Sequence, residues 1–522
     1  MTWFEESIFY HIYPLGLTGA PKQNDYGKPV NRIKELYPWI DHIQKLGFTG
    51  LYIGPLFESV GHGYETTDYR KVDSRLGTNE DLKKFVSYCH EKGIKVILDG
   101  VFNHTGRDFF AFKDIQKNRE NSRYIHWYCN VNFYGNNEYN DGFSYDNWGG
   151  YNLLVKLNQR NPEVQQYICD SIRFWIDAFD IDGLRLDAAD VLDFEFMKVL
   201  RRETSAMKQD FWLMGEVIHG QYERWMNHEM LHSVTNYALH KGLYSGHNEH
   251  NYFEIAHTVK RMHDLVADKV IDFYNFVDNH DVERIYTKLQ NKKHMIPVTI
   301  LLYTLPGIPS VYYGSEFGIE GKKERYSDDS IRPSLNLKEF KKNQWQALFQ
   351  RLAEVRHKNP ALIYGKYKEI FLTTRQYVFE RRLENYAVIT AVNNDDRDVE
   401  ISIPASGDYQ DWLSGETFTC EDGRINLTIK ENSGMVLVPA DQTVPKKPVK
   451  IHVKVKKEEP AEMKINEAVD LNKSYEDMSV EELQAAIIQK MKNNGPVTDQ
   501  MKKDVMNNVW RDSLINWVKS FR

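Results

Sequence analysis

The chain has 522 residues, of which 41% are hydrophobic and 13% aromatic, and its formal net charge at pH 7 is −7. This length and composition predict two or three globular domains, and the mildly acidic balance argues against a polyanionic partner such as nucleic acid. There is no apolar stretch of about 18 residues and no cleavable leader, so we expect no membrane partner and a cytoplasmic location. The four cysteines, Cys89, Cys129, Cys169 and Cys420, lack the spacing of zinc or redox sites, and no disulfide is expected.

Short β-branched or aromatic runs alternate with longer stretches of helical period from residue 7 to about residue 360. This alternation is the pattern of repeated βα units, and eight units predict a closed (β/α)8 TIM barrel of the α/β class. One connecting helix is well defined, because Asn161 can cap it, Pro162 suits its first turn and an apolar stripe follows to Phe179. The eight strand candidates are SIFYHIYP (7–14), GLYIGPLF (50–57), KVILDGVF (95–102), GLRLDAA (183–189), FWLMGEV (211–217), HSVTNY (232–237), FYNFVDN (273–279) and PSVYYGSE (309–316).

Two segments interrupt or follow this barrel pattern. Residues 105–154 are rich in Asn, Tyr and Gly and are too long for an ordinary βα loop, so they predict an inserted subdomain between the barrel segments 1–104 and 155–360. Residues 361–440 contain short strands and turns, which predict a C-terminal antiparallel β-sandwich.

The last eighty or so residues have a different character. Lysines and prolines in residues 441–465 predict a linker, although the alternation in KIHVKVK leaves an edge strand open. Residues 466–522 predict a small helical extension, with a capping box formed by Ser479 and Glu482. Two short helices are marginal alone in water, so this extension should dock on its own protein or on a partner. The remaining signals are the helix stop Gly495-Pro496 and the apolar stripe Trp510, Leu514, Trp517, Val518 and Phe521.

The run GLRLDAAD, residues 183–190, places two charged side chains in what otherwise reads as a buried strand. Strand residues alternate between faces, so Arg185 and Asp187 share one face. In a (β/α)8 barrel the carboxyl ends of the strands carry the active site, which gives the charged pair a functional meaning. Other predicted strand ends carry Asp99, Asn103, His104, Glu216, His280 and Asp281. Together these residues predict one polar site.

Three convergent acids with arginine and histidine suit cleavage of a glycosidic bond, in which one carboxyl group protonates the leaving oxygen and another meets the oxocarbenium-like centre. Metal binding is the competing chemistry, but no HExxH run or pair of histidines with a carboxylate is present. The histidines His228, His232, His240, His247 and His250 are predicted to be solvated. The aromatic residues predicted near the mouth, which could face sugar rings, are Tyr64, Phe102, Trp148 and Tyr151.

Four segments resemble, in order and spacing, the four motifs of the α-amylase family, glycoside hydrolase family 13. They are DGVFNH (99–104), GLRLDAAD (183–190), GEV (215–217) and FVDNHD (276–281). Two supporting segments, HGYETTDYRKVDSRLGT (62–78) and GIPSVYYGSEFGIEG (307–321), extend the resemblance over residues 7 to about 440.

The resemblance implies roles for these residues. Asp187 would be the nucleophile of a retaining reaction, Glu216 the general acid and base that arrives protonated, and Asp281 a clamp on sugar hydroxyls. Arg185 would orient Asp187 and keep it ionised. The residues implied to bind substrate are Tyr64, Asp99, His104, Arg185, His280 and Arg332.

Within the family, LVKLN (154–158) resembles the MPKLN segment of the neopullulanase, cyclomaltodextrinase and maltogenic amylase group. This likeness implies maltooligosaccharides, cyclodextrins or pullulan as substrates. The first barrel strand begins near Ser7, so the amino-terminal domain of that group is expected to be missing, and the oligomeric state is open. Where α-amylases often carry Lys-His, this chain has Asp190 and Val191. The usual calcium site is therefore incomplete although Asn103 is present; no cofactor is expected to be required, and calcium at another site is left open.

The sequence leads to the hypothesis of a cytoplasmic retaining α-glucan hydrolase that cuts α-1,4 bonds, with α-1,6 bonds left open. A 4-α-glucanotransferase or glucosyl isomerase is the first alternative, since it would use the same covalent intermediate with a sugar acceptor. The choice of acceptor depends on loops at the mouth. A non-catalytic glucan-binding protein is a remote alternative, because all three catalytic carboxylates are present.

Overall fold

The computed structural model describes residues 2–325, 327–442, 444–445, 448–449, 473–494, 501, 505 and 511–520. The chain divides into two compact units, residues 1–453 and residues 454–522, and each is described by itself. In the part of the chain that is described, no helix is both long enough and apolar enough to cross a membrane.

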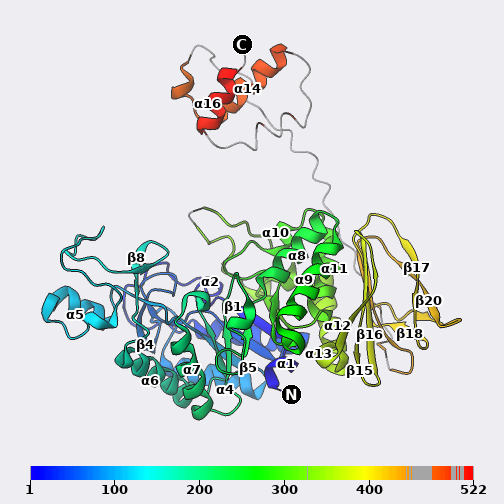
Figure 1. Cartoon of the computed structure of the whole chain (residues 1–522), viewed down its shortest axis with the longest axis horizontal. Helices are drawn as coiled ribbons and strands as arrows, with labels where there is room; N and C mark the ends of the chain where they lie inside the picture. Colours follow the sequence, from blue (N-terminus) through cyan, green and yellow to red (C-terminus); the bar gives the residue numbers. More distant parts are fainter. Residues whose placement is uncertain are drawn as a thin grey trace. The chain divides into compact units, whose positions relative to one another are not determined.

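Eight parallel strands form the centre of the larger unit (Figure 1). Their order is β11-β10-β9-β5-β2-β1-β13-β12, and a parallel bridge between Thr235 and Tyr274 joins the two ends and closes the barrel. The strands are β1 (Phe9–Ile12), β2 (Gly50–Ile53), β5 (Lys95–Gly100), β9 (Gly183–Leu186), β10 (Trp212–Gly215), β11 (Ser233–Val234), β12 (Tyr274–Phe276) and β13 (Ile308–Tyr312). Each lies within or overlaps a predicted strand, and the predicted TIM-barrel fold is confirmed.

Helices cover the outside of the barrel, and α6 (Pro162–Phe179) shows how the sequence specifies them. The Asn161 side chain accepts a hydrogen bond from the Glu163 N–H at 2.8 Å, as expected for a cap. Ile172 and Trp175 are buried on the inner face. The other helices of this unit outside the insertion are α1 (Trp3–Glu6), α2 (Pro14–Leu17), α3 (Tyr37–Leu46), α4 (Asn79–Glu91), α7 (Phe194–Met207), α8 (Tyr237–Asn248), α9 (Tyr252–Val266), α10 (Ile285–Lys288), α11 (Met295–Thr304), α12 (Gln344–Lys358) and α13 (Ala361–Tyr364).

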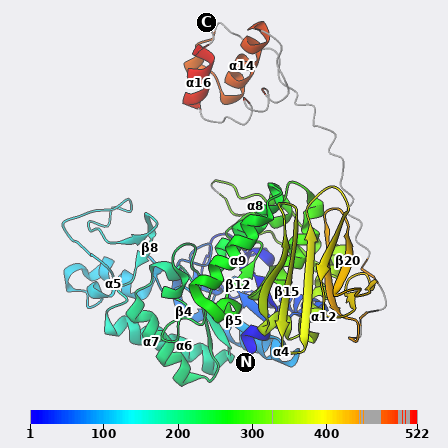
Figure 2. The same cartoon turned by 45° about the vertical axis from the view of Figure 1, so that its right-hand side comes forward.

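The insertion between β5 and α6 forms a small three-stranded sheet in the order β6-β8-β7. In Figures 1 and 2 it lies on the side of the unit opposite the C-terminal β layer. Its elements are β6 (His104–Gly106), α5 (Phe110–Asn118), β7 (Asn147–Trp148) and β8 (Tyr151–Lys156), and a hairpin of β3 (Phe57–Ser59) and β4 (Thr66–Val72) precedes it in the chain. Because β6 begins at His104, the insertion is tied directly to the end of a barrel strand.

The C-terminal part of the larger unit is an antiparallel β structure, as predicted. A six-stranded sheet in the order β14-β15-β16-β21-β18-β19 and the two-stranded sheet β17-β20 bury a common apolar core, which includes Ile389 and Leu437 from the first and Leu427 from the second. The strands are β14 (Lys366–Leu372), β15 (Gln376–Leu383), β16 (Tyr386–Asn393), β17 (Val399–Pro404), β18 (Tyr409–Asp411), β19 (Thr417–Phe418), β20 (Arg424–Ile429) and β21 (Ser433–Pro439). The domain limits stay predictions.

The smaller unit contains α14 (Val480–Asn494) and α16 (Arg511–Ser520). The predicted capping box is present, because Ser479 N donates to Glu482 Oε2 at 2.7 Å and Glu482 N donates to Ser479 Oγ at 3.2 Å. The two helices bury a shared apolar cluster of their own. Gly495, Pro496, Trp510, Phe521 and most of the predicted linker lie outside the described residues.

Two histidines of α8 are buried, so the prediction that they are solvated was wrong. His240 stacks on Phe276 with ring centroids 5.1 Å apart, and His247 Nε2 lies 3.1 Å from Tyr252 Oη. They share a helix face with Leu243, at the spacing i, i+3, i+7, and that face packs inward. Burial lowers the pKa of both His240 and His247 to about 3.

We therefore expect the larger unit to lose stability as the pH falls from about 6.5 towards 3. The unfolded chain binds protons at these histidines near pH 6.5 and the folded chain does not, so each costs about 1.4 kcal/mol per pH unit in that window. Urea unfolding at pH 5 and pH 7.5 measures the loss. The variant His247→Gln should reduce the difference, whereas His257→Gln, at an exposed position, should not. If the free energy of unfolding depends on pH identically in all three proteins, the buried His247 does not cause the loss of stability.

Candidate active site

The register of the barrel strands brings the predicted site residues together. Asp99 of β5 pairs with Arg185 of β9, and Leu186 of β9 pairs with Gly215 of β10. Asp187 and Glu216 follow these last two residues directly, so they emerge side by side at the carboxyl end of the barrel.

Arg185 lies at the centre of the site and is 3% exposed. Its Nη1 donates to Asp99 Oδ1 and to Asp187 Oδ1, both at 2.8 Å. Its Nη2 lies 2.7 Å from Glu216 Oε2. One guanidinium therefore contacts three carboxyl groups, which is the physical reason that an arginine is retained inside a buried strand.

In the cluster of Arg185, Asp99, Asp187 and Glu216, one positive group faces three acidic groups. Burial raises the pKa of Asp187 well above its usual range; Arg185 opposes the rise, while Glu216 and Asp99 add to it. Three closely spaced carboxyl groups cannot all ionise around one cation without a large cost, so we infer that the cluster shares a proton. The expectation that Arg185 helps to keep Asp187 ionised stays a prediction; Arg185 acts in that direction, while the neighbouring acids oppose it.

Glu216 is held on both carboxyl oxygens. Oε2 also accepts a hydrogen bond from Ala188 N at 3.0 Å, and Oε1 accepts one from Tyr237 Oη at 3.3 Å. Ala188 has a left-handed backbone with φ of 46°, a conformation that costs energy outside glycine and is often found at functional sites. Asn279 Nδ2 donates to Tyr237 Oη at 3.1 Å. Sequence reasoning missed Tyr237 and Asn279, although Asn279 lies within the motif FVDNHD.

Asp281 belongs to a second group of charges at the same end of the barrel. Arg332 Nη2 donates to Asp281 Oδ1 at 2.8 Å, and His280 Nε2 lies 2.9 Å from Asp281 Oδ2. Burial would raise the pKa of Asp281, but His280 and Arg332 hold it well below its usual range. Asp281 is therefore ionised, and its side chain is 33% exposed, open to a ligand.

Tyr64 connects the two groups of charges. Its hydroxyl contacts His280 Nε2 and donates to Asp99 Oδ2 at 3.1 Å. Tyr52 of β2, which sequence reasoning did not select, donates to the same oxygen at 2.8 Å. His104 Nε2 lies 3.1 Å from the Tyr64 carbonyl oxygen, and burial lowers the pKa of His104 to about 4, so it is neutral at pH 7.

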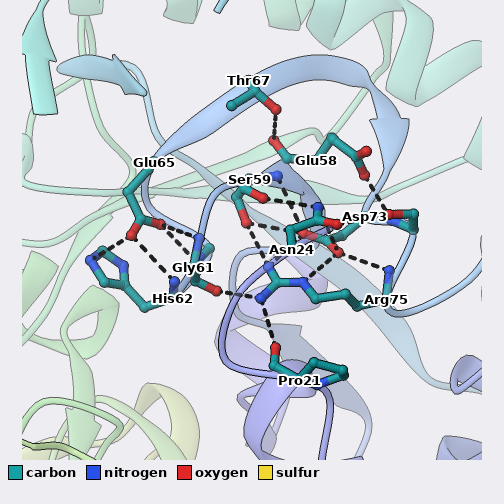
Figure 3. Close-up of polar contacts among 12 residues, drawn as sticks. Pro21, Asn24, Glu58, Ser59, Gly61, His62, Glu65, Thr67, Asp73 and Arg75 are labelled. Atoms are coloured by element: carbon teal, nitrogen blue, oxygen red, sulfur yellow. Dashed lines mark hydrogen bonds and ion pairs between the residues drawn. The ribbon is translucent and has the colours of Figure 1, made fainter. Parts of the chain in front are cut away.

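A buried network holds the loop that carries Tyr64 (Figure 3). Arg75 Nη1 donates to the Gly61 carbonyl oxygen at 2.7 Å, and Arg75 Nη2 donates to Asp73 Oδ2 at 2.8 Å. The Glu65 carboxylate accepts hydrogen bonds from the N–H groups of Gly61 at 3.4 Å and Gly63 at 3.2 Å. Charged partners on both sides thus hold the loop in place, which orients Tyr64 towards the site.

Of the aromatic residues predicted near the mouth of the barrel, two are exposed, and the prediction for Phe102 was wrong. Trp148 and Tyr151 are 40% and 63% exposed, and the Trp148 ring lies 6.1 Å from that of His104. Phe102, by contrast, is fully buried and stacks on Trp175 of α6. This contact with α6 places Phe102 under the helix layer and away from the active site.

The residues present do not fit the calcium site that the family resemblance implied. Asn103 Oδ1 is buried and has no partner within the described residues, but Val191 is 47% exposed and carries no ligand atom in its side chain. In the described part of the chain, no group of three or more His, Cys, Asp or Glu side chains is placed to hold a metal ion.

Replacing Arg185 should destabilise the fold more at high pH than at low pH. In Arg185→Met the three carboxyl groups lose their shared cation, and removing one partner of a buried ion pair costs about 3–5 kcal/mol. Protonation of the carboxyl groups at low pH removes the repulsion between them, so the melting temperature should drop further at pH 8 than at pH 5.5. Arg185→Lys, which keeps a positive charge, should show a smaller pH dependence. Equal losses at both pH values in Arg185→Met would contradict this account.

A closed parallel barrel with a buried arginine and an array of carboxyl groups at its strand ends defines a barrel enzyme with its active site at that end. The family model for the alpha-amylase catalytic domain matches residues 34–347, and the chain belongs to the alpha-amylase family. It is therefore a glycoside hydrolase, as the motifs predicted.

Known relatives agree with this assignment. The chain is 31% identical over 382 residues to the maltogenic alpha-amylase of Bacillus acidopullulyticus, covering 69% of this chain and 64% of that protein, which is less than two thirds of its length. It is 30% identical over 423 residues to a cyclomaltodextrinase of a Bacillus species, covering 75% and 73% of the two chains. The acarbose-soaked debranching enzyme of Nostoc punctiforme has a similar structure, with a TM-score of 0.71, 25% identity and coverage of 84% and 98%.

Proposed function

We propose that this glycoside hydrolase cleaves α-1,4 bonds of maltooligosaccharides, cyclodextrins or pullulan with retention, through a covalent glycosyl-enzyme. The observation that carries the proposal is that Asp187 and Glu216 are held by one guanidinium, on adjacent strand ends. Retaining enzymes have their two carboxyl groups about 5–5.5 Å apart, whereas inverting enzymes need about 6.5–9.5 Å to admit a water. The shared guanidinium favours the closer arrangement.

In this mechanism the proton shared by the cluster is used in the first step. Asp187, as the carboxylate, forms a bond to the anomeric carbon while Glu216, as the acid, transfers its proton to the leaving glycosidic oxygen. In the second step Glu216, now ionised, takes a proton from water as the water oxygen bonds to the anomeric carbon and the ester to Asp187 breaks. Two inversions give retention, and both carboxyl groups return to their starting states.

The second group of charges would bind the sugar at the cleavage point. The ionised Asp281, fixed by Arg332 and His280, can accept hydrogen bonds from two sugar hydroxyls. His280 can share its Nε2 hydrogen with a sugar hydroxyl, His104 supports the Tyr64 backbone through its Nε2, and the ring of Tyr64 provides a face for the pyranose. Asp99 holds Arg185 and Tyr64 in place.

The same residues would serve a 4-α-glucanotransferase or glucosyl isomerase, with a sugar hydroxyl in place of water in the second step. The exposed Trp148 and Tyr151 favour keeping this alternative, because exposed aromatic rings near the site can bind an acceptor sugar.

We also propose that the protein acts in the cytoplasm, since all four cysteines are unpaired. The α-1,6 bond is a second candidate for cleavage, because the similar Nostoc protein is named a debranching enzyme.

Product analysis distinguishes these functions. The protein is incubated with maltoheptaose, a cyclodextrin and pullulan, and the products are separated by chromatography. A hydrolase yields only products shorter than maltoheptaose, whereas a transferase also yields longer ones. The trisaccharide released from pullulan tests the α-1,6 bond, because cleavage of α-1,6 bonds gives maltotriose, whereas cleavage of α-1,4 bonds gives trisaccharides that retain an α-1,6 bond. No product from any of the three would contradict the proposed substrate class.

A further inference from the structure

A small cavity is lined both by residues of the active site and by residues of the core inside the barrel. Its volume is about 20 Å³, and its lining includes Glu216 and His280 on the side of the active site and Met214 and Phe276 on the other. Met214 and Phe276 belong to the apolar cluster that fills the barrel interior. A cavity of this volume has room for one water molecule, and water stays only where it finds two or more polar partners.

Two histidines in this lining each present an unpaired ring nitrogen. Within the described residues, His11 Nε2 and His280 Nδ1 are buried and have no hydrogen-bond partner. The two side chains are 3% and 1% exposed, and their ring centroids are 5.1 Å apart with the ring planes at 89°. Leaving buried polar atoms unsatisfied is costly, and both histidines are among the residues that line the cavity. One water molecule is the smallest group that satisfies both.

The contacts of His280 determine which of its nitrogens carries the hydrogen. His280 Nε2 lies 2.9 Å from Asp281 Oδ2, and an ionised carboxylate only accepts, so Nε2 carries the hydrogen. In the neutral ring Nδ1 is then an acceptor and requires a donor. Burial holds the pKa of His11 well below its usual range, and the positive charge of Arg185 lowers it further, so His11 is neutral. A neutral imidazole nitrogen can donate to or accept from water.

We propose that one water molecule in this cavity bridges His11 Nε2 and His280 Nδ1, and that His11 is a positioning residue which orients the His280 ring through this water, while Asp281 sets the tautomer with hydrogen on Nε2. The His11 ring is itself fixed, because it stacks on Tyr52 with centroids 4.1 Å apart. His11 acts only through the water and His280. The role of His280 as a donor to the sugar rests on the proposed function, but the bridging water does not.

A high-resolution crystal structure of the full chain without ligand tests the water directly. One solvent peak within hydrogen-bond distance of both nitrogens is expected in the wild type. The peak should persist in His11→Gln, whose amide can hold the same water, and should be absent in His11→Phe, which keeps an aromatic ring on Tyr52. An empty cavity in the wild type would overturn the proposal whether or not the protein acts on glucans.

Kinetics on maltoheptaose tests the positioning role. His11→Phe should lower kcat/KM about tenfold, as expected for one weakened hydrogen bond to the sugar, while His11→Gln should stay within about twofold. Histidine 15N spectra should show His280 with hydrogen on Nε2 in all three proteins, because Asp281 sets the tautomer, and a shifted Nδ1 signal in His11→Phe alone, where Nδ1 loses its hydrogen bond from the water. A folded His11→Phe protein with wild-type kcat/KM and an unchanged spectrum would overturn the role. Absence of glucan turnover in the wild type would instead contradict the proposed function.

Discussion

Asp187→Asn is expected to lower kcat on maltoheptaose by about 10⁴-fold or more while leaving the fold intact, because an amide cannot form the glycosyl ester and loss of a covalent nucleophile removes most of the catalysis. The amide oxygen can still accept a hydrogen bond from Arg185. The same change should raise the melting temperature slightly at pH 7. Since burial raises the pKa of Asp187, an ionised Asp187 destabilises the folded state there, and a neutral amide removes that cost.

The matched control for this substitution is Asp190→Asn, three residues further along the chain. Asp190 has no contact with Arg185 among those observed. The Asp190→Asn variant should retain near wild-type kcat. Wild-type turnover in Asp187→Asn, or an equal loss in both variants, would contradict the assignment of Asp187 as the nucleophile.

Glu216→Gln is expected to lose activity in a way that depends on the leaving group. On maltooligosaccharides kcat should fall by about 10²–10⁴-fold, the usual contribution of a general acid. On an α-glucosyl fluoride the first step should be far less affected, because fluoride leaves without protonation by a carboxylic acid. Glu229→Gln, an exposed position, serves as the control and should match the wild type on both substrates. The first step is read as kcat/KM, since the second step uses Glu216 as the base on either substrate. An equal loss of kcat/KM on both substrates would show that Glu216 is not the acid of the first step.

The barrel was predictable because its signals are local. Period-two and helical patterns, a helix cap at Asn161 and the alternation of faces in GLRLDAAD each depend on a few neighbouring residues. The location of the catalytic candidates followed from the rule that polar residues at the carboxyl ends of barrel strands gather on one side. The register of β9 with β10, which places Asp187 beside Glu216, agrees with that rule.

Other features could not be predicted from the sequence because they depend on contacts between distant segments. Tyr52 reads as an ordinary strand residue until its hydroxyl is seen on Asp99, and Tyr237 becomes part of the site only through Glu216. The burial of His240 and His247 did leave a signal, since their spacing with Leu243 matches one helix face. The proton balance of the cluster could not be predicted, because it depends on how closely three carboxyl groups approach one arginine.

The central claim is that the two carboxyl groups on Arg185 perform a retaining hydrolysis. It is tested most directly by proton NMR of the first turnovers of the wild-type protein on maltoheptaose, recorded before mutarotation mixes the anomers. The account predicts that the new reducing ends appear first as the α-anomer. Initial formation of the β-anomer would contradict it, because a single displacement by water would then replace the glycosyl-enzyme on Asp187.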